Sequence, residues 1–308
     1  MRKSLQLQAD MTQEFGTCVF DVTLDCEDGA PVGGEAEHAA LVTELALATQ
    51  AARADARIAV RVHPVDHPSF EADISHIAGR AGHVLTHIMV PKVESVADVN
   101  RVQAALAAAG AAHLPVHVLI ESPAAVHRAF DIAAHPRVQS ISFGLMDFVS
   151  AHAGAIPAEG MGIHGQFTHP LVLRAKLEIA SACHAHGKVP SHCVVTEFKN
   201  TDAIRSAAQK AARELGYTRM WSIHPDQIRT IVTAFSPAEA EIDTALAIID
   251  RAAAADWAPV QHEGRLHDRA SYRYYWQVLE RAHRTGRVLP APVQEVLQEV
   301  GAPIIAIS

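Results

Sequence analysis

Residues 116–123 of this 308-residue chain read Val-His-Val-Leu-Ile-Glu-Ser-Pro, and this stretch decides the fold. A short run rich in valine and isoleucine ends at Glu121, and a Ser-Pro pair typical of a helix start follows. Such runs are typical of strands buried on both faces of a parallel sheet. The stretch therefore predicts one strand of an α/β protein, with Glu121 at its carboxyl end.

The same unit recurs along the chain at intervals of about 26 to 36 residues, which a strand, a turn, a helix and a return loop would fill. Each apolar run ends near a charged residue. All of these charged residues would therefore open onto one face of a parallel sheet. They are Asp25, Arg61, Lys92, Glu121 and Asp147.

Alternating strand and helix patterns predict a parallel sheet. Seven or eight such units favour a (β/α)8 TIM barrel over an open sheet, and the carboxyl-end face of that barrel holds the active site. Strands are expected at 18–24, 57–62, 86–91, 116–121, 138–143 and, more weakly, 188–195 and 219–223. Helices are expected at 35–54, 95–109, 124–134, 170–186, 202–215 and 238–255.

The pattern changes near residue 257, which predicts two parts of the chain. Residues 1–256 would form the barrel domain, and residues 257–308 an appended helical segment with a helix near 268–286. The helix near 268–286 carries tyrosines and a tryptophan at helical spacing, which favours packing or a subunit contact.

Composition narrows the class of protein. Apolar residues make up 49% and charged residues 19% of the chain, as in a globular protein, and no apolar run approaches the roughly 18 residues of a membrane helix. A net charge of -8 argues against nucleic-acid and membrane-surface partners. The first 15 residues do not resemble a signal peptide, and the four cysteines form no C-x-x-C pair. We therefore expect a cytoplasmic protein without disulfides.

Glu121 and Asp147 are one strand–helix unit apart, so they should end adjacent strands. Two carboxylates with room for water suit Mg²⁺, with Mn²⁺ as the alternative. Such an ion could hold the carboxylate and 2-oxygen of an oxo acid or hydroxy acid and stabilise an enolate. The alternative is that both acids form ordinary salt bridges or helix caps.

Other charged or titratable residues also have candidate roles in binding the substrate. Arg61 has a fork matched to a substrate carboxylate. Lys92 would contact a substrate anion, or else pair with Glu94 or Glu121. His224, before a proline, would either touch substrate or hydrogen-bond within the end of the barrel.

Three acids, Asp25, Glu27 and Asp28, lie just past the first strand. They would provide a general base or hydrogen-bond the water molecules of a metal. The alternative is an exposed acidic loop.

Six ordered segments across residues 24–228 resemble motifs of the citrate lyase β-subunit-like group of the HpcH/HpaI aldolase superfamily. That group includes citryl-CoA, malyl-CoA and citramalyl-CoA lyases. The similar segments are Leu-Asp-Cys-Glu-Asp-Gly (24–29), Val-Arg-Val-His (60–63), Val-Pro-Lys-Val-Glu (90–94), Ile-Glu-Ser-Pro (120–123), Phe-Gly-Leu-Met-Asp-Phe (143–148) and Ile-His-Pro-Asp-Gln-Ile (223–228).

This resemblance implies a TIM barrel with Mg²⁺ on Glu121 and Asp147 and with Arg61 on the oxo-acid end of the substrate. It implies reversible carbon–carbon cleavage of a 3-hydroxyacyl-CoA thioester to an acyl-CoA and a 2-oxo acid. It also implies that an aspartate from the C-terminal segment of a neighbouring subunit completes the site, as Asp268 would here. We therefore expect a homo-oligomer, a trimer or a hexamer. The alternative role of Asp268 is a helix cap.

The chain also departs from the family pattern. Residue 63 is His where the family has Asn, and segment 189–200 differs from the stretch that helps to shape the CoA site. These departures leave three rivals open. They are a thioester hydrolase on the same scaffold, a metal-dependent aldolase acting on free 2-oxo acids, and a non-catalytic binding subunit.

Overall fold

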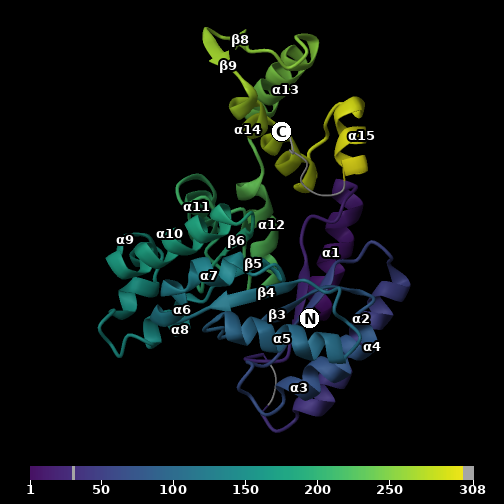
Figure 1. The fold of residues 1–308 in the computed structure, drawn as a ribbon, viewed down its shortest axis with the longest axis vertical. Helices are drawn as coiled ribbons and strands as arrows, with labels where there is room; N and C mark the ends of the chain where they lie inside the picture. Colours follow the sequence, from purple (N-terminus) through teal and green to yellow (C-terminus); the bar gives the residue numbers. More distant parts are fainter. Residues whose placement is uncertain (30–31, 301–308) are drawn as a thin grey trace. The chain divides into compact units, whose positions relative to one another are not determined.

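The computed structural model describes residues 1–29 and 32–300. Seven parallel strands form one sheet, and each strand lies beside the strand that follows it in sequence (Figure 1). Each parallel pair needs a crossover connection, as the alternating pattern predicted. The strands are β1 (Val22–Asp25), β2 (Ile58–Arg61), β3 (Leu85–Val90), β4 (Val116–Ile120), β5 (Val138–Phe143), β6 (Val189–His192) and β7 (Arg219–Met220).

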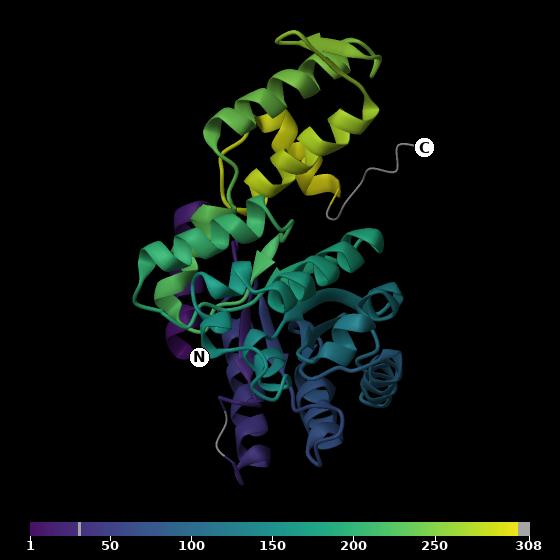
Figure 2. The same ribbon diagram turned by 90° about the vertical axis from the view of Figure 1, so that its left-hand side faces the viewer.

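Helices connect the successive strands, and further helices precede β1 and follow β7 (Figures 1 and 2). The long ones are α1 (Arg2–Phe15), α2 (Glu35–Ala52), α5 (Val96–Ala108), α10 (Pro170–Ala185), α11 (Thr201–Arg213) and α12 (Pro225–Phe235). The short ones are α3 (Phe70–Asp73), the π-helix η1 (Ile74–Ala78), α4 (Gly79–Ala81), α6 (Pro123–His127), α7 (Ala129–Ala134), α8 (Leu145–Ser150), the 3₁₀ helix η2 (Ala158–Met161) and α9 (Gly165–Thr168).

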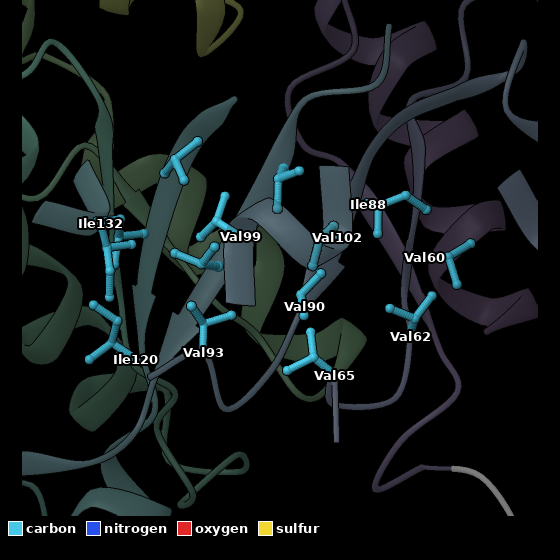
Figure 3. Close-up of a cluster of buried hydrophobic side chains, with 14 of the residues drawn as sticks. Val60, Val62, Val65, Ile88, Val90, Val93, Val99, Val102, Ile120 and Ile132 are labelled. Atoms are coloured by element: carbon cyan, nitrogen blue, oxygen red, sulfur yellow. The ribbon is translucent and has the colours of Figure 1, made fainter. Parts of the chain in front are cut away.

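The main hydrophobic core lies between the strands and these helices. Val60 of β2 and Ile88 of β3 belong to the same buried cluster as Val99 and Val102 of α5, and all four are 0% exposed (Figure 3). Burying an aliphatic side chain of this size contributes about 1.5–3 kcal/mol to stability. This layer fixes the strands, and with them the position of every residue at a strand end.

The sheet curls until its first and last strands meet through side chains. Asp21, just before β1, lies 2.8 Å from Arg219 of β7 and 2.5 Å from Arg57, which precedes β2. Since β1 and β7 stand at opposite ends of the strand order, an ion pair between them requires strong curvature. The polar contact lies at the amino ends of the strands.

The predicted TIM barrel is confirmed as an α/β fold with a curled parallel sheet. The predicted eight strands are not found, because the parallel sheet of the described residues has seven strands. The chain after β7 continues into α12 and then α13 (Glu239–Ala254) rather than into an eighth strand. The sequence predicted α13 as a helix at 238–255, whereas α12 was not among the predicted helices.

A second compact unit comprises residues 10–19 and 232–300. It contains α13, the antiparallel hairpin of β8 (Val260–His262) and β9 (Arg265–His267), α14 (Arg269–Arg284) and α15 (Ala291–Val300). Ile248 of α13 and Leu279 of α14 are both 0% exposed in a core separate from the main one. The structure therefore divides the chain earlier than residue 257, and α13 packs with the C-terminal helices. The predicted helix near 268–286 corresponds to α14.

All four cysteines carry free thiols, as expected. Among the described residues, no helix combines the length and the apolar character that crossing a membrane would need.

Candidate active site

The five predicted charged residues lie at the carboxyl ends of the strands. Asp25 and Arg61 are the last residues of β1 and β2, and Lys92 lies just beyond β3. Glu121 follows β4 directly, and Asp147 lies in the first turn of α8, which follows β5. Direct contacts and electrostatic interactions connect these residues into one cluster.

Arg61 holds Asp25 through two parallel hydrogen bonds. Its Nε donates to Asp25 Oδ1 over 2.7 Å, and its Nη2 donates to Oδ2 over 2.6 Å. The backbone N–H groups of Glu27 and Gly29 donate to the same carboxylate at 3.0 and 2.9 Å. Burial alone would raise the pKa of Asp25, but these hydrogen bonds and the charge of Arg61 hold it below its usual value. Asp25 is therefore a fixed anion that orients the guanidinium.

Glu27 connects Arg61 to Lys92. Its Oε2 lies 2.7 Å from Arg61 Nη1, and its Oε1 accepts a hydrogen bond from Lys92 Nζ at 2.7 Å. The Glu27 side chain is 7% exposed, whereas that of Asp28, 3.5 Å from Arg61 Nη1, is 67% exposed. The alternative of an exposed acidic loop therefore describes Asp28 but not Glu27.

Lys92 has a left-handed backbone with φ of 52°, which is uncommon for a residue other than glycine. This conformation places its backbone N–H 3.4 Å from Glu121 Oε1, while its ammonium reaches Glu27. Burial would lower the pKa of Lys92, but the hydrogen bond and charge of Glu27 and the charges of Glu121 and Asp147 raise it overall. Lys92 is therefore a cation that lies between Glu27 and the two acids at β4 and β5.

Glu121 and Asp147 form a close pair of acids. Glu121 is 5% exposed. Burial, then the charge of Asp147 and a hydrogen bond with Asp147, raise the pKa of Glu121 to about 8. In the absence of a cation, the Glu121 carboxyl therefore largely keeps its proton at neutral pH.

The alternative roles of these acids are not what the structure shows. Ser122, rather than Glu121, caps α6 by accepting a hydrogen bond from the N–H of Ala125 at 3.0 Å. Ser122 also donates to Glu94 Oε2 at 2.7 Å, so Glu94 is not the partner of Lys92. Within residues 1–29 and 32–300, neither Glu121 nor Asp147 forms a salt bridge at 4.0 Å or less.

The pair suits a hard divalent cation. The described residues contain no group of three or more His, Cys, Asp or Glu side chains arranged to hold a metal. An ion at Glu121 and Asp147 would therefore have two carboxylate ligands and complete its shell with water or substrate oxygens, as Mg²⁺ usually does. The raised pKa of Glu121 beside Asp147 fits such an ion, since a divalent cation would offset the repulsion between the two carboxylates.

Gly144 makes room for Glu121. A Cβ atom at residue 144 would lie 2.5 Å from Glu121 Cγ and 2.9 Å from Cδ, although the backbone (φ -93°, ψ 89°) tolerates a side chain. We therefore expect Gly144→Ala to displace the carboxylate. Cation affinity should fall, and turnover should fall by about 10²-fold. Overpacking should also cost about 1–3 kcal/mol of unfolding free energy.

Calorimetric titration of Mg²⁺ and thermal melting measure the two effects of Gly144→Ala. Gly79→Ala is the matched control, because its added Cβ meets nothing closer than 3.7 Å. Unchanged Mg²⁺ affinity in Gly144→Ala would contradict the assignment of this space to the Glu121 side chain.

His224 lies just before α12, with its side chain partly exposed. Its Nδ1 accepts a hydrogen bond from the N–H of Asp226 at 3.2 Å, and its ring lies 4.8 Å from the ring of Phe198. Phe198 belongs to the divergent segment after β6, where residues 196–202 line an open groove of about 780 Å³. The local hydrogen bond matches the structural alternative, and contact of His224 with substrate stays a prediction.

Asp268 is the N-cap of α14. Its Oδ1 accepts hydrogen bonds from the N–H groups of Ala270 and Ser271 at 3.0 and 3.4 Å. The capping role is therefore confirmed. Asp268 belongs to the C-terminal unit, and its contribution to the site of a neighbouring subunit stays a prediction.

Sequence reasoning missed one pair of residues near the strand ends. His63, noted only as a departure from the family pattern, places its Nδ1 2.6 Å from Asp73 Oδ2 of α3. The signal was available in part, because His63 follows Arg61 by two residues and shares its side of an extended chain. The spacing of residues in the sequence did not identify Asp73 as the partner of His63.

Residues 5–225 match the family described as HpcH/HpaI aldolase/citrate lyase. The L-malyl-CoA/β-methylmalyl-CoA lyase of Cereibacter sphaeroides is 30% identical over 273 residues, which cover 82% of this chain and 84% of the relative.

Two solved structures extend this similarity to three dimensions. A citrate lyase from Burkholderia xenovorans LB400 is 48% identical, with a TM-score of 0.79 over 96% of this chain and 91% of that one. The protein CitE from Mycobacterium tuberculosis, solved with magnesium, acetoacetate and coenzyme A, has a TM-score of 0.61 and 20% identity. That alignment covers 91% of this chain and 95% of that one, and it shows a common fold.

Proposed function

This chain belongs to the HpcH/HpaI aldolase/citrate lyase family and is a carbon–carbon lyase; from that premise we propose that it cleaves, or in reverse forms, a 3-hydroxyacyl-CoA thioester with a divalent cation. The cation would be Mg²⁺, with Mn²⁺ as the alternative. The observation that carries the proposal is the pair of Glu121, which is buried, and Asp147, which is exposed, beside Lys92. The malyl-CoA specificity of the Cereibacter relative supports the thioester class.

The reaction balances without an oxidant or reductant. In cleavage, the C3 hydroxyl loses its proton, and its electrons form the carbonyl of the 2-oxo acid. The C2–C3 bond breaks, and its electron pair forms the enolate of the thioester. A proton added at C2 then gives the acyl-CoA, so malyl-CoA would yield glyoxylate and acetyl-CoA.

Glu121 and Asp147 would hold the cation, which when bound supplies positive charge to the oxygens of the oxo-acid fragment. Lys92 would hold a second anionic group beside them, with its charge secured by Glu27. The carboxylate pair thus fixes one end of the substrate at the ends of β4 and β5. A fixed oxo-acid end is what orients the breaking bond.

Arg61 would bind the substrate carboxylate while Asp25 and Glu27 position it. A guanidinium has five N–H donors. Asp25 receives two of them, and Glu27 lies beside Nη1. The N–H groups that remain would serve a substrate carboxylate, which extends the prediction that Arg61 contacts the oxo-acid end.

The CoA moiety would extend into the groove of residues 196–202. Lys199 lies with its ammonium 5.6 Å from the centre of the Phe198 ring, so the groove combines a cation with an aromatic face. These are the groups that a phosphorylated nucleotide needs. The divergent segment 189–200 is thus compatible with the proposed thioester substrate.

Assembly completes the proposal. We expect Asp268 to reach the site of a neighbouring subunit, and the enzyme to be a homo-oligomer, a trimer or a hexamer. A cytoplasmic location remains our expectation. Light scattering coupled to gel filtration tests the subunit number, and a purely monomeric, active enzyme would exclude a shared site.

The activity itself is tested with malyl-CoA, citramalyl-CoA and citryl-CoA. We expect release of an acyl-CoA and a 2-oxo acid with Mg²⁺, loss of turnover by at least about 10²-fold in EDTA, and recovery when Mg²⁺ is restored. The 2-oxo acid is detected as its hydrazone and the acyl-CoA by chromatography. The same assay before and after refilling the site makes each sample its own control.

Other products would identify the rivals. Free malate and CoA without glyoxylate would indicate a thioester hydrolase. Cleavage of a free 4-hydroxy-2-oxo acid to pyruvate would indicate the aldolase. Calorimetric binding of Mg²⁺ and CoA without turnover of any of these compounds would indicate a binding subunit and would contradict the lyase proposal.

A further inference from the structure

Two buried histidines stack face to face on the inner side of the curled sheet. The rings of His87 on β3 and His117 on β4 have centroids 3.5 Å apart and planes 15° from parallel. His87 is 1% exposed and His117 is 4% exposed. Their neighbours Ile88 and Val118 belong to the core between the strands and the helices, so the two rings point to the opposite face of the sheet. We call this pair the histidine stack.

The hydrogen bonds of His87 fix its tautomer. Thr86 Oγ1 donates its single hydrogen to Ile58 O at 3.0 Å, so in its other contact, 3.0 Å from His87 Nδ1, the ring nitrogen is the donor. Nε2 of the neutral ring therefore carries a lone pair, and within the described residues this buried atom has no hydrogen-bond partner. A proton added at Nε2 would create a buried cation with an N–H that lacks an acceptor, which is costly.

His117 is also held as a neutral ring. Its Nε2 lies 2.8 Å from Gln139 Oε1, and because an amide oxygen only accepts hydrogen bonds, Nε2 carries the hydrogen. An added proton would therefore enter at Nδ1 and make this ring a cation stacked directly on the other ring. Two cations at this separation repel each other strongly in a buried site. Each ring therefore opposes the protonation of its neighbour.

The charged groups around the histidine stack favour the neutral state overall. They are Asp21 before β1, Arg57 before β2 and Arg219 of β7. The two arginines oppose protonation, whereas Asp21 favours it but is already paired with both of them. Burial first, and then Arg219, lower the pKa of His117 to about 3. Burial first, and then His117, lower the pKa of His87 well below its usual value of 6.5.

We propose that the histidine stack is an acid-sensitive switch, which leaves β3 and β4 closed while both rings are neutral and forces these strands apart in mild acid. The inference goes beyond the proposed function and does not depend on it. It concerns the candidate site nonetheless, because Glu121 directly follows β4. Opening of β4 would move Glu121 away from Asp147 and dismantle the carboxylate pair.

Proton linkage gives the sign of the effect. Histidines of the unfolded chain take up protons as the pH falls through about 6.5, whereas the folded stack stays neutral to a much lower pH. The stability of the closed form is therefore fully present above pH 6.5 and is lost progressively below it. Each ring should raise the unfolding constant by about 10-fold per pH unit, and both rings together by about 100-fold. Asp21 stays ionised in this range, because its pKa lies far below it.

The test compares the wild type with His117→Gln and with the double variant His87→Gln/His117→Gln. Denaturant unfolding is measured in EDTA at pH values from about 7.5 to about 4.5. Gln keeps a polar amide but takes up no proton, so its effect on packing does not depend on pH. Below pH 6.5, the wild-type unfolding constant should rise by about 10-fold per pH unit relative to the single variant and by about 100-fold relative to the double variant. These ratios cancel the titration of Glu121, which all three proteins retain.

His83→Gln is the matched control, because His83 is exposed and lies before β3. Its unfolding constant should follow that of the wild type at every pH. If His117→Gln does not fold, His87→Gln takes its place with the same expected 10-fold slope. A ratio between wild type and single variant that is constant with pH would overturn the proposal.

Hydrogen exchange locates the opening and includes a measurement that needs no variant. In the wild type, peptides covering residues 85–90 and 116–120 should lose protection between about pH 7 and pH 5, after correction for the chemical exchange rate. The loss should be about 10³-fold greater than in the double variant, since two protons act over about 1.5 pH units. Unchanged protection of β3 and β4 in the wild type at pH 5, or an equal loss in the double variant, would overturn the switch.

Discussion

Glu121→Gln is expected to lower turnover of the thioester by about 10³-fold or more, because it removes one of the two charges that would hold the cation. The fold should survive, since Gln has the same shape and the native carboxyl already carries a proton at neutral pH. Burial and Asp147 raise the pKa of Glu121 to about 8. Calorimetric titration should show loss of Mg²⁺ binding together with the loss of activity.

The raised pKa also gives the sign of a stability effect. A carboxyl whose folded pKa lies above its unfolded value of 4.5 stabilises the cation-free protein fully below pH 4.5. That contribution is lost as the pH rises toward and through about 8. In EDTA, Glu121→Gln should therefore melt like the wild type near pH 4 and above it at pH 8.

Glu159→Gln, at an exposed residue, is the matched control for the same chemical change. It should alter neither Mg²⁺ affinity nor the pH dependence of melting. A Glu121→Gln enzyme with wild-type activity would remove Glu121 from the site.

Arg61→Lys is expected to cost both activity and stability, although it keeps the charge. A single ammonium cannot reproduce the paired hydrogen bonds to Asp25 and also contact Glu27 at 2.7 Å. Hydrogen bonds to charged groups contribute about 1.5–3 kcal/mol, so the free energy of unfolding should fall by about that amount. Turnover should fall by about 10²-fold, because the substrate carboxylate would lose its fixed partner.

Denaturant unfolding and steady-state kinetics measure the two losses. Arg80→Lys is the control, since Arg80 forms an exposed pair with Glu44 that contributes little. Wild-type kinetics in Arg61→Lys would mean that this guanidinium serves the fold alone, whereas lower kcat with unchanged stability would assign it to the substrate.

The strand ends could be predicted from sequence because each apolar run stops near a charge. Parallel strands place their carboxyl ends together, so Glu121 and Asp147 were expected side by side. The structure agrees, and their interaction raises the pKa of Glu121. The pattern of apolar residues and the spacing of charges are local properties of the sequence. They therefore predicted the strand ends and the pairing of Glu121 with Asp147.

The pairings within the cluster depend on loop conformation, which spacing does not encode. Lys92 pairs with Glu27 from a distant loop, and its left-handed backbone directs this contact. His63 meets Asp73 because a helix of four residues follows the loop after β2 at the right distance. No periodicity marks so short a helix. The same limit applies to the eighth strand, which the residues after β7 replace with helices.

The side-chain contact between Asp21, Arg57 and Arg219 has a consequence for acid stress. Among the described residues, β1 and β7 share no backbone ladder, and this ionic latch connects their amino ends. Burial would raise the pKa of Asp21, but Arg219 and Arg57 hold it far below its usual value. Only strong acid would therefore release the latch. The bare edges of the two strands would then be open to added strands from other molecules, and precipitation would begin there before the helices melt.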